Sequence, residues 1–130
     1  MPTKLVIAIV DDDESAREGT ADLIKSIGFA AKAFPHAEGF LQSDSIGCTA
    51  CLITDVRMPG MTGLELHECL VRSGNAIPTI LVTAFPNDRD RAQAMRYGIT
   101  CYLTKPYSED ELLGCIRVAL KDDDVGKRIP

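Results

Sequence analysis

The chain has 130 residues, a length that fits one domain with a single hydrophobic core. Hydrophobic residues make up 45% of the sequence and charged residues 25%, a composition typical of a soluble globular protein. Nineteen acidic residues outweigh fourteen basic ones and give a net charge of −5. The chain therefore lacks the basic excess that nucleic-acid binding needs, and it is better suited to binding a cation.

The sequence also indicates a cellular compartment. No stretch approaches the ~20 apolar residues of a membrane span, and the opening MPTKLVIAIV has too short an apolar run for a secretory signal. The five cysteines are Cys48, Cys51, Cys69, Cys101 and Cys115. Their odd number and mostly apolar surroundings predict reduced thiols in a cytoplasmic protein with no membrane contact. Cys48 and Cys51 have zinc or redox spacing, but no second pair follows, so core positions are favoured.

Apolar runs and helical stretches alternate about five times along the chain. The predicted strands cover residues 4–10, 30–34, 50–55, 77–84 and 101–106. The runs at 4–10, 50–55 and 77–84 are continuously apolar, which is typical of strands buried on both faces of a sheet. The weaker alternating run at 30–34 indicates a strand nearer an edge.

Helical periodicity fills the intervals between these strands. The predicted helices cover residues 14–28, 36–43, 62–74, 87–98 and 108–120. Gly28, Gly74 and Gly98 stand where three of the helices should end. His36 and His67 are isolated in the sequence, and both are predicted to lie on the surface.

Five strand–helix units predict an α/β fold, a doubly wound (βα)₅ parallel sheet covered on both faces by right-handed crossovers. We expect the domain to span residues 1–121, and residues 122–130 to form a C-terminal tail or the start of a linker. In open sheets of this type, ligands bind beyond the carboxyl ends of the strands, where the strand order switches. Function is therefore expected at the strand ends.

Chemically active side chains stand at four of these strand ends. Asp11 and Asp12 follow the first strand, Asp55 ends the third, Thr83 the fourth and Lys105 the fifth. Two carboxylates about 5 Å apart repel each other by roughly 3 kcal/mol at an effective dielectric constant near 20. Three of them need a cationic partner, and Mg²⁺ prefers oxygen ligands that a phosphate completes. The set therefore predicts a Mg²⁺ site.

A carboxylate beside Mg²⁺, an ammonium and a hydroxyl suits phosphoryl transfer. The carboxylate can attack phosphorus to form an aspartyl phosphate. Positioning and charge neutralisation supply most of the catalysis of such a step. Mg²⁺ and Lys105 would each neutralise one phosphoryl oxygen, and Thr83 would hydrogen-bond the third.

Four motifs, VDDDE, TDVRMPGMTG, TILVTA and YLTKPY, resemble the receiver domain of bacterial two-component response regulators, in the same order and over about residues 5–120. The resemblance implies the flavodoxin-like strand order 2-1-3-4-5. The implied site consists of Asp55 as phosphoacceptor, of Asp11, Asp12, Asp55 and the backbone carbonyl of Arg57 as Mg²⁺ ligands, and of Thr83 and Lys105 as contacts of the phosphoryl group. The Lys105–Pro106 peptide bond is implied to be cis. Asp13 and Glu14 are then left to serve the helix start.

The resemblance also implies a reversible switch between two states. Thr83 moves towards the phosphoryl group, and an aromatic side chain of the fifth strand, here Tyr102, turns inward. A half-buried tyrosine without a switching role is the alternative. Arg57 and Phe85 occupy positions that tune the lifetime of the phosphoryl group in this family. We predict that Phe85 shields the group and that Arg57 crowds the attacking water; alternatively, Phe85 packs under the following helix.

The implied partners are a sensor histidine kinase and an output domain or downstream protein, with no nucleic acid bound by this chain. A homodimer through the fourth helix, the fifth strand and the fifth helix is also predicted. Arg89, Arg91 and Arg96 of the fourth helix fit such a face, although they also fit a merely solvated one. The chain is expected to catalyse its own phosphorylation and dephosphorylation and no other reaction.

Two other functions stay open. The segment DDDES, residues 11–15, fits the Asp-x-Asp-x-Ser/Thr outline of aspartate-nucleophile phosphatases, but the fourth strand ends LVTAF without the acid that such enzymes need. A pseudo-receiver would use the fold for protein contacts alone, which the intact acid set and Lys105 argue against. The tail fits a complete single-domain regulator as well as a receiver joined to further domains.

Overall fold

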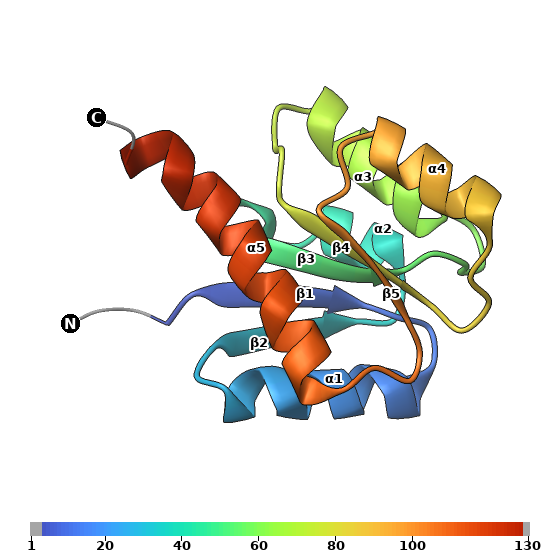
Figure 1. The fold of residues 1–130 in the computed structure, drawn as a ribbon, viewed down its shortest axis with the longest axis horizontal. Coiled ribbons are helices and arrows are strands. Elements are labelled where there is room, and N and C mark those ends of the chain that lie inside the picture. The colour runs from blue at the N-terminus through green and yellow to red at the C-terminus, as the bar shows by residue number, and fades with distance from the viewer. Residues whose placement is uncertain (1–3, 129–130) are drawn as a thin grey trace.

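The computed structural model of the protein describes residues 4–128, with the side chains of residues 4–120. Its five strands are β1 (Val6–Val10), β2 (Ala30–Phe34), β3 (Thr49–Asp55), β4 (Thr79–Thr83) and β5 (Cys101–Thr104). They form one sheet in the order β2-β1-β3-β4-β5, and every neighbouring pair is parallel (Figure 1). The predicted strand order is confirmed, and the order switches between β1 and β3, in the middle of the sheet.

The helices are α1 (Glu14–Ser26), α2 (Ala37–Leu41), α3 (Gly63–Arg72), α4 (Asp88–Arg96) and α5 (Glu109–Arg128), and a short 3₁₀ helix, η1 (Ile46–Cys48), precedes β3. α1 and α5 cover one face of the sheet, and α2, α3 and α4 cover the other (Figure 1). Within β1, Ile9 packs against α1 and α5, whereas Val10 packs against α2 and α3. Burial on both faces explains the continuous apolar runs of the central strands, and the edge strand β2 keeps exposed positions.

Two glycines stand where a side chain would be disfavoured, one at the end of α1 and one at the functional end of the sheet. Gly28 has a φ of 104° just after α1, a left-handed conformation that side chains disfavour, so the predicted end of this helix is confirmed. At Gly63, the first residue of α3, a Cβ atom would collide with the backbone carbonyl oxygen of Asp55. The absence of a side chain therefore lets α3 begin directly against the strand end that carries Asp55.

Two surface and core assignments from the sequence are wrong. His67 is buried with 7% of its surface exposed, because its ring lies on the inner side of α3. Its Nδ1 lies 3.0 Å from Thr79 Oγ1, and its Nε2 donates to the backbone carbonyl of Tyr97 at 3.0 Å. The core assignment holds for Cys51 but not for Cys48, which is exposed at the end of η1. His36 lies on the surface as predicted.

The backbone of α5 continues to Arg128, into the segment expected to be a tail or a linker. The division into a domain at 1–121 and a tail at 122–130 stays a prediction. Between residues 4 and 128, no helix combines the length and the apolar character that crossing a bilayer requires.

Candidate functional site

The carboxyl ends of β1 and β3 bring three carboxylates together. Asp11 and Asp12 directly follow β1, and Asp55 is the last residue of β3. One oxygen from each of the three side chains lies within 4.8 Å of the others, and no second group of this kind occurs among the described residues. Asp11 is only 3% exposed, and 13% of the Asp55 side chain is exposed. Close and poorly solvated carboxylates repel each other strongly, so the arrangement fits a bound cation.

Asp13 and Glu14, in the acidic run after β1, serve the start of α1 as predicted. Asp13 is the N-cap of α1 and accepts a hydrogen bond from the Ser15 amide at 3.1 Å. Asp11 turns inward, and its Oδ1 accepts from the Asp13 amide at 2.9 Å. Asp12 is exposed at the same rim. Glu14 lies in the first turn of α1, where a negative charge is favourable.

Lys105 joins two of the three carboxylates. Its Nζ donates to Asp11 Oδ2 at 2.9 Å and to Asp55 Oδ2 at 2.8 Å. Partial burial alone would lower the pKa of this ammonium, but hydrogen bonds and Coulombic attraction from Asp55 and Asp11 outweigh burial and raise the pKa to about 12. The Lys105 amide donates to the carbonyl of Thr83 at 2.8 Å, which ties the end of β5 to β4. The Lys105–Pro106 peptide bond is cis, as the resemblance implies.

Both carboxylate oxygens of Asp55 accept hydrogen bonds, one from Lys105 and the other from Arg57. The Arg57 amide donates to Asp55 Oδ1 at 3.2 Å. The Arg57 guanidinium turns towards α4 and pairs with Asp90 Oδ2 at 3.0 Å, which also accepts from Asn87 Nδ2 at 2.9 Å. Arg57 could crowd water at Asp55 only after this ion pair opens.

Thr83 is buried at the end of β4, but its hydroxyl is not directed to the carboxylates. Its Oγ1 accepts a hydrogen bond from the Phe85 amide at 3.0 Å. The Phe85 side chain is 73% exposed, so the alternative in which it packs under α4 is wrong. The structure therefore assembles Asp11, Asp12, Asp55 and Lys105, and it leaves Thr83 engaged with its own loop.

Tyr102 lies half-buried on β5, against the cluster formed by Val56, Leu81, Ala94 and Ile99. Its hydroxyl oxygen is buried and makes no hydrogen bond within the described part of the chain. The guanidinium carbon of Arg91 lies 4.9 Å from the centre of its ring, in a cation–π contact. The sequence placed Arg91 only on a charged helix face, since its partner lies on a strand that follows later in the chain.

Two contacts from α1 were not predicted from the sequence. Arg17 Nη1 donates to the backbone carbonyl of Asp11 at 2.8 Å, and Thr20 Oγ1 lies 2.6 Å from the hydroxyl of Tyr107. A spacing of three residues puts Arg17 and Thr20 on the same side of the helix, and this spacing is the only feature of the sequence that indicates a shared role. Their partners depend on tertiary packing.

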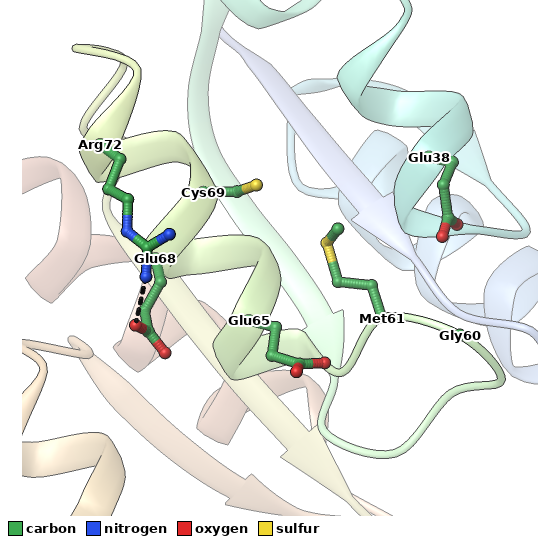
Figure 2. A pocket seen from close by; sticks show the side chains of 7 residues that line it. All are labelled: Glu38, Gly60, Met61, Glu65, Glu68, Cys69 and Arg72. Atoms are coloured by element: carbon green, nitrogen blue, oxygen red, sulfur yellow. Dashed lines mark hydrogen bonds and ion pairs between the residues drawn. The ribbon is translucent and has the colours of Figure 1, made fainter.

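A further hollow of about 440 Å³ lies between α2 and α3, away from Lys105 (Figure 2). Its lining includes Glu65 and Glu68, but both carboxylates have structural partners. Glu65 completes the capping box of α3 with Thr62, and Glu68 pairs with Arg72 at 3.5 Å, drawn as the dashed line in Figure 2. Glu65 and Glu68 therefore act in the structure of α3 and do not mark this hollow as a second functional site.

Fold and site together define a flavodoxin-like α/β domain with a cluster of three carboxylates, able to hold a metal ion, at the carboxyl ends of its central strands. The sequence profile of the response regulator receiver domain matches residues 7–117. The chain belongs to the response regulator receiver family, a family of signalling domains.

Individual relatives support this assignment. Response regulator protein TmoT of Ectopseudomonas mendocina is 40% identical over 116 residues, which cover 89% of this chain and 53% of TmoT. The structure of response regulator StyR shares 36% identity and a TM-score of 0.86, over 97% of this chain and 64% of StyR. The crystal structure of FixJ-N shares 31% identity and a TM-score of 0.81, over 93% of this chain and 96% of FixJ-N. The chain spans about half the length of TmoT.

Proposed function

We propose that Asp55 accepts a phosphoryl group from a sensor histidine kinase in a two-component pathway. The observation that carries the proposal is the placement of Lys105 Nζ, 2.8 Å from Asp55 and 2.9 Å from Asp11, within a group of three carboxylates. A fixed ammonium and a cation on either side of a carboxylate are the charges that an incoming phosphoryl group needs. The site thus combines a nucleophile with preorganised neutralisation.

Asp11, Asp12, Asp55 and the backbone carbonyl of Arg57 would hold Mg²⁺, which neutralises phosphoryl oxygens when it is bound. In the transfer, a carboxylate oxygen of Asp55 forms the O–P bond, the P–N bond of the phosphohistidine breaks, and the leaving imidazole nitrogen takes up a proton. Lys105 stays near the acceptor and pairs with a phosphoryl oxygen. Hydrolysis of the acyl phosphate later restores the carboxylate. No other reaction is proposed for the chain.

We further propose that the phosphoryl group is read out through Thr83 and Tyr102. The Thr83 hydroxyl, which now accepts a hydrogen bond from the Phe85 amide, turns to donate one to a phosphoryl oxygen, and Phe85 then shields the group. The Tyr102 hydroxyl is buried without a hydrogen-bond partner, which supports a second stable position for this side chain. The response reaches an output domain, a downstream protein or a second copy through α4, β5 and α5, in the cytoplasm and without nucleic acid bound by this domain.

The test is the intact mass of the protein after incubation with acetyl phosphate, with and without Mg²⁺. We expect one phosphoryl adduct that requires Mg²⁺ in the wild type and is lost in Asp55→Asn. Asp12→Asn should retain the acceptor but need more Mg²⁺. No adduct in the wild type would contradict the proposal and favour a pseudo-receiver.

An adduct that survives Asp55→Asn and requires Asp11 would favour the phosphatase function instead. The geometry supports Asp55, because its side chain is 13% exposed whereas the Asp11 side chain is only 5% exposed, so Asp55 is easier for a phosphoryl donor to reach. Turnover of a chromogenic phosphate ester would give an independent measure of phosphatase activity.

A further inference from the structure

A hydrogen bond between two side-chain hydroxyls joins α1 to the loop after β5. Thr20 Oγ1 and the Tyr107 hydroxyl lie 2.6 Å apart, although the residues are 87 positions apart in the sequence. Thr20 is 7% exposed and Tyr107 is half-buried. Burial raises the pKa of the Tyr107 hydroxyl above its ordinary value, so both groups keep their protons at neutral pH. A short bond between poorly solvated groups fixes their relative position.

The loop that this bond reaches carries Lys105, two residues before Tyr107. On one side the loop is tied to the sheet, through the Lys105 amide and the carbonyl of Thr83. On the other side it enters α5 through a capping box, in which Glu111 accepts from the Ser108 amide and Ser108 accepts from the Glu111 amide. Neither of these contacts joins the loop to α1.

Packing holds the loop only in part: the Tyr107 ring packs against the core cluster that α1 and α5 share, but the rest of the loop borders an open groove. An apolar groove of about 530 Å³ lies between α1 and the loop, and its lining includes Gly19 and Leu23 from α1 and Pro106 from the loop. The Thr20–Tyr107 bond adds to this packing a directed polar contact, which sets the distance between the loop and α1.

We propose that Thr20 and Tyr107 are positioning residues for phosphoryl transfer, which hold the Lys105 ammonium between Asp11 and Asp55. The inference rests on the proposed function. Lys105 Nζ touches both carboxylates at 2.8–2.9 Å, so a small movement of the loop lengthens at least one contact. Displacements of about 1 Å in a catalytic group can slow a reaction strongly.

Positioning of Lys105 has a signature that loss of stability does not have. The ammonium assists phosphoryl transfer, but its positive charge also opposes binding of a cation at the same carboxylates. A loosened Lys105 should therefore slow phosphorylation and at the same time strengthen Mg²⁺ binding. A general loss of structure would weaken both.

The test uses Tyr107→Phe and Thr20→Val, which remove one hydroxyl each at nearly constant size, and the double variant. Each single variant should be phosphorylated by acetyl phosphate about five-fold more slowly, the value expected for loss of one neutral hydrogen bond. The double variant should be no slower than either single variant, because both remove the same bond. Calorimetric titration should show about two-fold tighter Mg²⁺ binding in all three variants.

Two controls keep the interpretation specific. Thr20→Ser retains a hydroxyl, so its phosphorylation rate and its Mg²⁺ affinity should equal those of the wild type. Tyr97→Phe removes a hydroxyl from a tyrosine at the end of α4 and should leave both unchanged. Wild-type rates in Tyr107→Phe and Thr20→Val would overturn the inference, and so would slower phosphorylation together with weaker Mg²⁺ binding. If the wild type itself gives no adduct, the proposed function fails first and the inference falls with it.

Discussion

Two regions at the same edge of the sheet differ in how completely their polar groups are paired. The acid–lysine cluster consists of Asp11, Asp12, Asp55 and Lys105, and the proposed switch region consists of Thr83, Phe85, Arg91 and Tyr102. In the cluster, Asp11 and Asp55 accept a hydrogen bond on each carboxylate oxygen. In the switch region, Tyr102 buries a hydroxyl without a partner and Phe85 exposes an aromatic ring.

This difference teaches how one small domain can combine chemistry with signalling. Phosphoryl transfer gains from groups that are already in place before the reaction. A reversible switch needs two states that differ by only a few kcal/mol. For the proposed switch, incomplete pairing around Tyr102 would keep that difference small, because the present state lacks a hydrogen bond that another arrangement can offer.

The largest expected effect follows removal of the ammonium from the cluster. Lys105→Met should slow phosphorylation of Asp55 by acetyl phosphate about 100-fold, the usual cost of losing one preorganised charge donor. It should also lower the free energy of unfolding by about 3 kcal/mol, since two poorly solvated carboxylates lose their partner. Rates from intact mass and urea unfolding measure the two effects. Lys32→Met on the exposed edge of β2 is the matched control and should change neither value.

The pH dependence of the same ion pairs gives a second test. The pKa of Lys105 in the folded protein, about 12, lies above its ordinary value of 10.5. The pairs therefore stabilise the fold fully below pH 10.5, and this contribution is lost as the pH rises through about 12. The difference in free energy of unfolding between the wild type and Lys105→Met should be constant from pH 7 to 9 and shrink above about pH 10.5. A difference that shrinks between pH 7 and 9 would show that Lys105 is not held as described.

These two regions also differ in how far the sequence predicts them. The cluster follows from a simple rule, because the carboxyl ends of parallel strands share one edge, so Asp11, Asp55 and Lys105 had to meet. The support from α1 does not follow from any local pattern. Thr20 meets Tyr107 only because α1 and α5 cover the same face of the sheet.

His67 shows the same limit of sequence-based prediction. A single histidine within a helix is usually a surface residue, and nothing local indicates the two hydrogen-bonding partners of this ring. Those partners come from the start of β4 and from the residue after α4, segments that only the folded sheet brings beside α3. Patterns within one element predicted the fold, whereas contacts between distant elements required the structure.

A smaller effect is expected from Tyr102→Phe in the switch region. The substitution removes a buried hydroxyl without a hydrogen bond, so the unphosphorylated protein should become more stable by up to about 1 kcal/mol. Thermal unfolding of the unphosphorylated form measures this change. Tyr97→Phe, at a more exposed tyrosine, should have no measurable effect. A loss of stability in Tyr102→Phe would mean that the hydroxyl has a good partner, and the contrast between the two regions would disappear.

The smallest effect concerns the ion pair between Arg57, which lies beside the acid–lysine cluster, and Asp90 of α4. Arg57 pairs with Asp90 at 3.0 Å, but 59% of the Arg57 side chain and 22% of the Asp90 side chain are exposed. Solvent screens such a pair, so a double-mutant cycle with Arg57→Ala and Asp90→Ala should give a coupling energy of about 0.5 kcal/mol, falling further at high salt. The exposed pair of Arg72 and Glu68 within α3 is the reference and should give a similar value.

A weak bond is what this position requires. Arg57 follows Asp55, the proposed phosphoacceptor, by two residues, and Asp90 lies in the first turn of α4, so their ion pair links the proposed site of modification to the helix proposed to transmit the signal. A coupling energy above about 2 kcal/mol in the unphosphorylated protein would exceed the range of solvent-exposed pairs. Such a strong pair would hold Arg57 on α4, and moving its guanidinium to Asp55 would then cost more than about 2 kcal/mol. A small value would keep two positions of Arg57 accessible, the observed one on α4 and the proposed one over the phosphoryl group after phosphorylation.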